Sequence, residues 1–256
     1  MSLHEWNLTM PRHPFVGLAN YAQILATPSF WQAIGRTLYF TLVSTGLELL
    51  LGLAIALLLN RPFRGRGLLR ALVLLPWALP TVVNGIMWRW IDNPDYGALN
   101  ALLTQAGLLH AYRNWLGSPW SALNMVILAD VWKMTPLAAL LLLAGLQTIP
   151  RELYESAAID GAGGWRQFLG ITLPLLRTSI LIVLVARTIE AFKVFDIIYI
   201  MTRGGPGDGT MTIAYYAYTQ AFSSLLFGKG AAISYLIALF ILLLSVGYVR
   251  LLRPAQ

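Results

Sequence analysis

The chain contains no cysteine and few charged side chains. With no Cys among its 256 residues, disulfide bonds and thiolate metal ligands are excluded. Only 11% of the residues are charged and 57% are hydrophobic, whereas soluble domains carry about 25% charged residues. The composition therefore excludes an ordinary soluble domain.

Long apolar runs indicate helices that cross a membrane. Crossing a hydrocarbon core of about 30 Å takes about 20 helical residues. Runs of that length cover residues 37–59, 68–91, 121–146, 171–199 and 231–251. We therefore expect an all-α polytopic membrane protein with about five transmembrane helices. Its membrane domain would cover residues 37–253, after an N-terminal non-cytoplasmic or interfacial segment, 1–36.

The arginines lie where the positive-inside rule expects cytoplasmic loops. They are Arg61, Arg64, Arg66 and Arg70 after the first run, Arg151, Arg166 and Arg177 around residues 150–174, and Arg250 and Arg253 after the last run. Membrane topology thus explains the net charge of +7, which in a soluble protein would suggest binding to nucleic acid. We expect no nucleic-acid partner, and we expect residues 150–174 to face the cytoplasm.

Five spans with a cytoplasmic C-terminus place the N-terminus outside. Residues 1–36 contain no apolar signal segment that would carry them across. Either this short polar tail translocates by itself, or a first helix is missing. We favour the missing helix.

Proline and glycine interrupt several predicted helices. Pro76 and Pro80 lie four residues apart in the run 68–91, which predicts a bent helix that either lines a pathway or is bent for structural reasons alone. The outer loop 92–120 contains turn residues at 93–97. The glycines of residues 201–210 predict a second, non-helical outer connection.

Residues 150–174 predict a helix, a glycine hinge and a second helix on the cytoplasmic surface. Pro150 suits a helix start, Glu152 and Glu155 complement the helix dipole, and three glycines from Gly161 onward end the helix. We expect glycine at 161 because a Cβ would obstruct the reversal of the chain. An ordinary amphipathic interfacial loop is the alternative.

The same residues resemble a family motif. Glu155-Ser156-Ala157, then Gly161, then Ile171-x-Leu173-Pro174 is similar to the EAA motif of binding-protein-dependent ABC transporter permeases, with Ser156 in place of the usual alanine. The segments FVGLANY, LGLAIALLLNRPFRGRGLLR, LLPWALPTVV and FDIIYIMTRGGPGDGT resemble the carbohydrate-uptake branch, which includes the maltose and glycerol-phosphate systems. The resemblance covers nearly everything from Phe15 to Arg253.

The resemblance implies a type I ABC importer permease fold and a role in sugar import. The chain would form half of the translocation pathway for a di- or oligosaccharide of the maltose or trehalose type. Its partners would be a second homologous permease, a homodimeric ABC ATPase, an extracytoplasmic sugar-binding protein and the lipid bilayer of a bacterial or archaeal cell membrane. The residues implied in coupling to the ATPase are Glu155, Ser156, Ala157, Gly161, Ile171, Leu173 and Pro174.

The chain lacks the sequence of a nucleotide site. A P-loop needs Gly-x-x-x-x-Gly-Lys-Ser/Thr, and Gly228-Lys229 is followed by Gly230. The sequence also contains no catalytic zinc motif or nucleophile elbow. We therefore expect a non-catalytic subunit with no cofactor or metal, and the resemblance implies that ATP and Mg bind the partner ATPase.

Two helical faces carry charges inside predicted spans, where ionisable residues are functional candidates. Spacings of i, i+3, i+4 and i+7 place Asp130, Lys133, Met134 and Leu137 on one face, and Arg187, Glu190, Ala191 and Val194 on another. In the resembling transporters the sugar binds between these helices. The alternative is that Asp130 with Lys133, and Glu190 with Lys193, form neutralising pairs. We expect Glu48 to serve packing or an interhelical hydrogen bond.

Two other functions remain open. One is an ABC permease for glycerol phosphate, a polyol or another solute. The other, from a different class, is a secondary carrier or channel, which would need no ATPase and would leave the EAA spacing unexplained.

Overall fold

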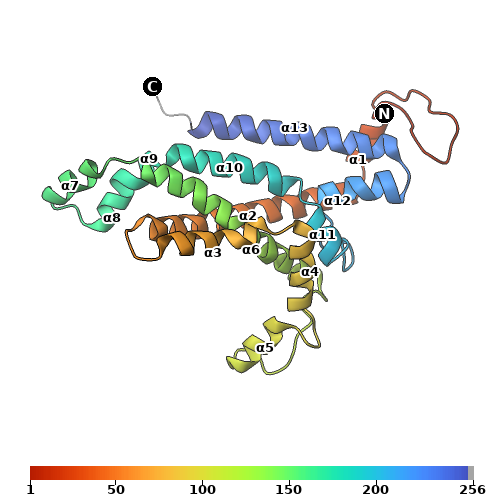
Figure 1. The fold of residues 1–256 in the computed structure, drawn as a ribbon. Coiled ribbons are helices and arrows are strands. Elements are labelled where there is room, and N and C mark those ends of the chain that lie inside the picture. Colours follow the sequence, from red (N-terminus) through yellow and green to blue (C-terminus); the bar gives the residue numbers. More distant parts are fainter. Residues whose placement is uncertain (253–256) are drawn as a thin grey trace. The chain divides into compact units, whose positions relative to one another are not determined.

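The computed structural model describes residues 1–252, which are mainly helical, so Arg253 lies outside the described residues. In chain order the elements are α1 (Ala19–Leu25), α2 (Pro28–Asn60), α3 (Arg66–Ala78), α4 (Thr81–Ile91), α5 (Ala98–Gln105), α6 (Pro119–Gln147), α7 (Arg151–Ile159), α8 (Gly164–Gln167), the π-helix η1 (Phe168–Thr172), α9 (Leu173–Leu175), α10 (Arg177–Phe192), α11 (Asp196–Met201), α12 (Ile213–Tyr218), the π-helix η2 (Thr219–Ser223) and α13 (Phe227–Leu252) (Figure 1).

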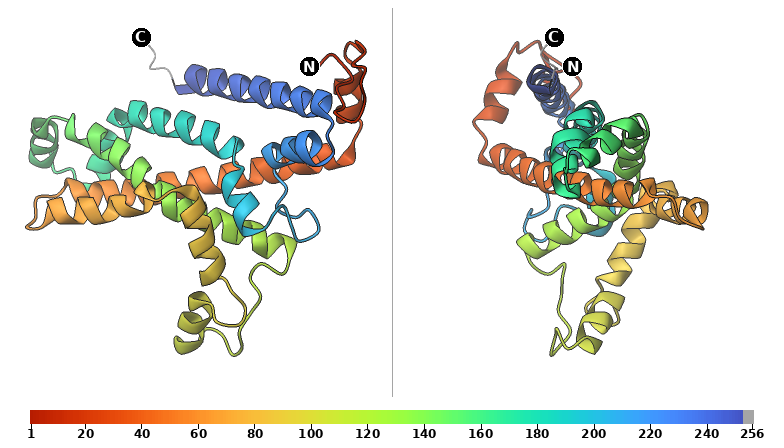
Figure 2. Two further views of the ribbon diagram at one scale, coloured as in Figure 1. Left: turned by 45° about the vertical axis from the view of Figure 1, so that its right-hand side comes forward. Right: turned by 90° about the vertical axis from the view of Figure 1, so that its left-hand side faces the viewer.

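Three helices, α2, α6 and α13, are long and apolar enough to cross a membrane, and each runs unbroken in Figure 2. Two bent helix pairs raise the number of candidate spans to five if each pair is one span. This confirms the predicted class of about five spans. One boundary is wrong: α2 begins at Pro28, inside the segment 1–36, because a helix continues past its apolar run into polar sequence.

The second helix, α2, buries polar residues and exposes leucines. Its buried polar side chains are Thr37, Thr41, Ser44, Thr45 and Glu48. Its exposed apolar residues are Leu42, Leu47, Leu50, Leu51 and Leu58. A protein surrounded by water would bury the leucines and expose the polar side chains. A protein surrounded by lipid exposes apolar side chains and directs polar groups inward, as α2 does.

The apolar run 68–91 is two helices rather than the single bent helix that the sequence predicts. Pro76 lies within α3, which ends at Ala78. Leu79 has an extended backbone (ψ 137°), and α4 begins after Pro80. The Pro80 ring disfavours helical backbone at the residue before it, so the helix ends there.

The run 171–199 also departs from a single helix. Residues 164–175 and α10 are bent by 61°, and α10 ends at Phe192, before a separate short helix, α11. Val194 therefore lies beyond the helix. The expectation that it continues the face of Arg187 is wrong.

The chain divides into two compact units. The first contains residues 1–44, 80–130 and 189–243, and the second contains residues 45–79, 131–188 and the chain from 244 onward. In the first unit the Ile213 N–H donates to the Thr37 hydroxyl (2.8 Å), and the Tyr39 hydroxyl donates to Asn124 (2.9 Å). The first unit thus joins helices far apart in the sequence.

The two connections predicted to lie outside the membrane belong to the first unit and have the predicted turn chemistry. Asn93 Oδ1 accepts the Asp95 N–H (2.8 Å), and Asn100 donates to the Arg113 carbonyl (2.9 Å). Residues 202–212 are not helical. Gly204 has φ +81°, and a Cβ there would lie 2.8 Å from the Tyr215 ring.

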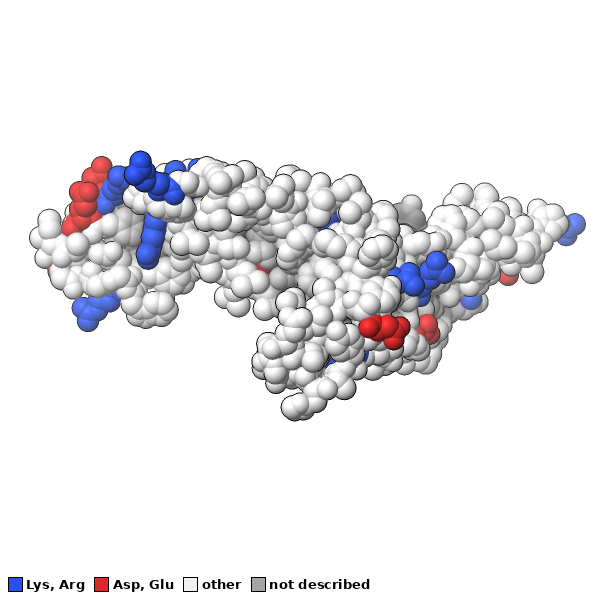
Figure 3. Space-filling view, turned by 60° about the horizontal axis from the view of Figure 1, so that its bottom comes forward, with Lys and Arg blue, Asp and Glu red and all other residues white. Residues whose placement is uncertain are grey.

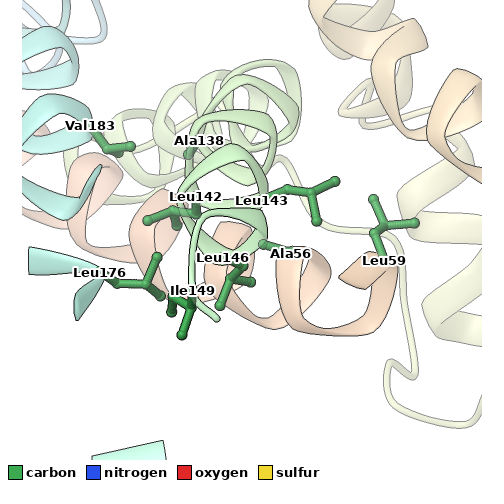
Figure 4. Packing of buried hydrophobic residues seen from close by; sticks show 9 residues of the cluster. All are labelled: Ala56, Leu59, Ala138, Leu142, Leu143, Leu146, Ile149, Leu176 and Val183. Atoms are coloured by element: carbon green, nitrogen blue, oxygen red, sulfur yellow. The ribbon is translucent and has the colours of Figure 1, made fainter. Parts of the chain in front are cut away.

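The second unit contains a cluster of apolar side chains from α2, α6, α10 and their connections (Figure 4). Its buried members are Ala56, Leu59, Ala138, Leu142, Leu143, Leu146, Ile149, Leu176 and Val183. A Cβ on Gly52 of α2 would lie 2.9 Å from the Ala138 Cβ of α6. Glycine at 52 thus permits the close approach of α2 and α6.

A buried carboxyl group in the first unit predicts a dependence of stability on pH. Asp92, which follows α4, is 0% exposed, and its carboxylate oxygens have no hydrogen-bond partner within residues 1–252. Burial raises the pKa of Asp92 from 3.8 to about 7. Between those values the folded protein holds a proton that the unfolded chain has lost, so stability falls as the pH rises through that window.

We expect Asp92→Asn to flatten this dependence. The apparent melting temperature of the detergent-solubilised parent should fall between pH 5 and pH 8, and that of the variant should fall less. Asp95→Asn is the matched control, because Asp95 is exposed on the same turn. Equal pH profiles for the parent and Asp92→Asn would contradict the assignment.

Candidate functional site

Residues 150–174 of the second unit fold as two short helical stretches joined by a glycine turn (Figure 1). α7 begins after Pro150, whose backbone is extended (ψ 138°), and Glu152 lies in its first turn, where a carboxylate complements the helix dipole. The second stretch consists of α8, η1 and α9. This is the helix, glycine turn and helix that the sequence predicts.

The end of α7 explains one of the glycines. The Ala162 N–H donates to the Ala157 carbonyl (2.8 Å), and the Gly161 N–H donates to the Ala158 carbonyl (3.1 Å). This pair of bonds is a Schellman cap, which places its glycine in the left-handed region, here with φ +76°. A Cβ at 161 would meet no atom within 4 Å, so the expected steric obstruction is wrong. Glycine suits this position because of its backbone conformation.

One side of the segment is fastened to the second unit. The Tyr154 hydroxyl of α7 and the Thr172 hydroxyl of η1 share a hydrogen bond of 2.9 Å. Tyr154 and Ile171 also pack against the apolar cluster described above. The two stretches are therefore held to each other and to the ends of the long helices.

The other side presents apolar side chains to its surroundings. Ile159 at the end of α7 is 87% exposed, and Trp165 of α8 is 71% exposed and stacks on Phe168 with ring centroids 5.6 Å apart. Exposed apolar groups of this size favour a protein or membrane contact. The sequence analysis missed Tyr154, Ile159 and Trp165 because it considered only the fixed positions of the motif. It did not ask which helical face the residues between those positions occupy.

The predicted coupling residues lie mainly on the exposed side. Glu155, Ser156, Gly161, Leu173 and Pro174 are exposed, whereas Ala157 and Ile171 are partly buried. The structure thus collects the seven residues on one short segment, and Ile171 contributes to its attachment.

A buried ion pair joins α2 to α10 in the second unit. Arg187 Nε lies 2.5 Å from Glu48 Oε2, and Arg187 Nη2 donates to Glu48 Oε1 at 2.8 Å. The side chains are 2% and 0% exposed. This two-point geometry is the strong form of a guanidinium–carboxylate contact. The expectation that Glu48 serves an interhelical hydrogen bond is therefore confirmed.

The remaining predicted pathway residues occupy different surroundings. On α6, the side chains of Asp130, Lys133, Met134 and Leu137 are all partly buried. On α10, Ala191 is buried and Glu190 is exposed. Each set keeps its helical face except Val194.

The alternative of neutralising pairs on α6 and α10 is not observed. The Lys133 and Lys193 side chains form no ion pair or hydrogen bond within the described part of the chain. Arg187 instead contacts Glu48 on another helix, 139 residues away along the chain.

Comparisons with known proteins place residues 48–253 in a protein family described as the binding-protein-dependent transport system inner membrane component. A trehalose/maltose transport system permease protein, MalF of Thermococcus litoralis, is 45% identical over 99% of this chain and 85% of its own length. The trehalose transport system permease protein SugA of Mycobacterium tuberculosis is 37% identical over 100% of this chain and 81% of its own. A sulfoquinovosyl glycerol permease, SmoG of Agrobacterium fabrum, is 40% identical over 93% and 77%.

A solved structure shares the fold. The chain resembles a subunit in the crystal structure of a bacterial alginate ABC transporter in complex with an alginate pentasaccharide-bound periplasmic protein. The TM-score is 0.82, with 24% identity, and the match covers 93% of this chain and 83% of that one.

The Glu48–Arg187 pair yields a test of stability. Glu48→Met removes one partner of the buried Arg187, and breaking a buried ion pair typically costs about 3–5 kcal/mol. We expect this single variant to lower the melting temperature of the purified protein strongly. The double variant Glu48→Met/Arg187→Met removes both charges and should recover most of the loss. A double variant that is as unstable as the sum of both single variants would contradict this account.

Proposed function

The chain belongs to the family of binding-protein-dependent transport system inner membrane components, and from this we propose that it is the membrane-spanning subunit of an ATP-driven sugar importer. The substrate would be a di- or oligosaccharide of the maltose or trehalose type. The observation that carries the proposal is the 45% identity, over 99% of the chain, to a trehalose/maltose permease. The EAA-like segment and the candidate spans support it.

In this proposal the energy comes from a partner. A homodimeric ATPase that binds ATP and Mg contacts residues 150–174, and this chain catalyses no reaction itself. The exposed Ile159 and Trp165 supply apolar contact area. The hydrogen bond between Tyr154 and Thr172 passes a displacement of α7 to the rest of the second unit. A second homologous permease and an extracytoplasmic sugar-binding protein complete the importer. It would work in the cell membrane of a bacterium or archaeon.

We propose that the sugar passes along the predicted faces of α6 and α10. A sugar needs hydrogen-bonding side chains with apolar surface beside them. Asp130, Lys133 and Glu190 offer polar groups, with Met134 and Leu137 as apolar neighbours on α6. Arg187 would act differently: its contact with Glu48 makes it a residue that positions α10.

A glycerol-containing solute is a second candidate for the substrate. The 40% identity to a permease named for sulfoquinovosyl glycerol favours keeping it. Uptake assays with labelled maltose, trehalose and glycerol phosphate by the reconstituted complex separate the two candidates.

Purification of the tagged chain from its native membranes tests the partners. We expect an ATPase and a second permease to co-purify with the parent chain. Ile159→Asp should reduce ATPase recovery because it places a charge in an apolar contact. Leu108→Asp is the matched control, since Leu108 is also well exposed (71%) but lies outside the segment. Recovery of the intact parent without any ATPase would support the carrier or channel alternative.

Gly161 and Gly163 form a matched pair for testing coupling. Gly161 has φ +76°, whereas Gly163 has φ −68°, and a Cβ at either position would meet open space. A β-branched side chain is strained only at the first, where left-handed backbone costs an L-residue about 1–2 kcal/mol. Gly161→Val should therefore reduce sugar-stimulated ATP hydrolysis and uptake, while Gly163→Val should retain both. Equal activity in the two variants, at equal membrane abundance, would contradict the role of this turn.

A further inference from the structure

The second unit contains a pocket of about 490 Å³ to which the proposed function assigns no ligand. It lies where the end of α2, the start of α3, the end of α6 and α7 meet. Its lining residues are Asn60, Arg61, Pro62, Arg66, Arg70, Leu146, Gln147, Ile149, Arg151 and Tyr154.

The pocket is strongly basic. Four arginines line it, and no acidic residue does. None of the four forms an ion pair or a side-chain hydrogen bond within residues 1–252. Figure 3 shows Lys and Arg side chains, together with some acidic ones, at its left-hand end, the end at which α3, α7 and α8 lie in Figure 1. The acidic side chains do not line the pocket. This local excess of positive charge favours an anionic ligand.

One of these guanidinium groups, that of the partly buried Arg70, has two nitrogen atoms that are buried and unsatisfied. The Nε and Nη2 atoms of Arg70 are inaccessible to solvent and have no hydrogen-bond partner within residues 1–252. Leaving buried donors of a charged group unpaired costs free energy. A ligand with several acceptor oxygens would satisfy them.

The donor set matches a phosphate group. Guanidinium groups bind phosphate through pairs of parallel hydrogen bonds. Asn60 and Gln147 add amide donors at the same pocket. Leu146 and Ile149 contribute apolar lining, which accommodates the carbon atoms beside a phosphodiester.

The surroundings of the pocket favour a lipid as the carrier of that phosphate. Arg66 and Arg70 lie on α3, whose Leu68, Leu72 and Leu75 are 69%, 51% and 59% exposed. These leucines offer acyl chains a surface on the same helix as the arginines. The arginine distribution also predicts that this end faces the cytoplasm, where membranes concentrate anionic lipids.

We infer that the pocket binds the phosphate headgroup of an anionic phospholipid, with its acyl chains against α3. The headgroup contacts Arg61, Arg66 and Arg70 near one end of the membrane domain and Arg151 at the start of α7. The inference depends on the membrane assignment and on the pocket, and not on the identity of the transported solute.

Lipid titration of the purified complex tests this site. The complex is stripped of lipid in detergent and titrated with phosphatidylglycerol, phosphatidylcholine or inorganic phosphate, with native mass spectrometry as the readout. We expect retention of phosphatidylglycerol over phosphatidylcholine. Arg70→Gln should weaken phosphatidylglycerol binding at least about tenfold, as loss of a charge-assisted hydrogen bond does.

Arg64→Gln is the matched control, because Arg64 is exposed in the same basic connection but does not line the pocket. This variant should change the affinity for phosphatidylglycerol by less than about twofold, whereas a tenfold change corresponds to about 1.4 kcal/mol. Arg61→Gln should also weaken lipid binding. It replaces Arg70→Gln as the test variant if Arg70→Gln does not elute as a single species in gel filtration.

Three outcomes would overturn the inference. Equal losses in Arg64→Gln and Arg70→Gln would mean attraction to surface charge alone. Displacement of the lipid by inorganic phosphate at equal concentration would indicate a site for free phosphate. Loss of the co-purified ATPase in Arg70→Gln, with lipid binding unchanged, would identify the pocket as a protein contact.

Discussion

The ion pair between Glu48 and Arg187 constrains the arrangement of the second unit. Two opposite charges without access to solvent are favourable in contact, because separating them removes that attraction while each stays desolvated. The pair therefore fixes α10 against α2 in both register and rotation. One turn further along α2, Gly52 allows the close approach of α6 at Ala138. The helices before and after residues 150–174 are thus both fastened to α2.

This arrangement gives the exposed segment a mechanical connection to the membrane helices. α7 is held through Tyr154 and Thr172, and Ile171 packs on the same apolar cluster that contains Leu142 and Leu176. A protein that pushes on Ile159 or Trp165 would not displace a loose loop, because the atoms behind these residues are close-packed and transmit strain. The displacement would reach α6 and α10, which carry our candidate residues for the solute pathway. The α2 contacts would make the two helices move together.

The sequence predicts features that depend on local chemistry and misses those that depend on distant contacts. Apolar run lengths predict the spans, and turn residues predict the outer connections and the glycine turn. Glu48, a partner of Arg187, is 139 residues away along the chain, and no local pattern indicates this contact. The end of α3 at Ala78 follows from the steric effect of Pro80 on the residue before it. The apolar run continues past this point, so run length alone predicts one helix. Val194 was misplaced because a helical spacing is meaningful only as far as the helix continues.

The arginines after α2 satisfy two physical demands at once. Positive charge at this end favours a cytoplasmic position, and for that demand any of the four arginines would serve equally. Topology does not require that Arg70 Nε and Nη2 be buried, nor that Arg61, Arg66 and Arg151 line one pocket while Arg64 stays outside it. A charge that acts only on topology is best left in water, where its solvation costs nothing. The burial of two unpaired guanidinium nitrogens of Arg70 is therefore a cost that topology does not explain, and an anionic group in the pocket would offset it.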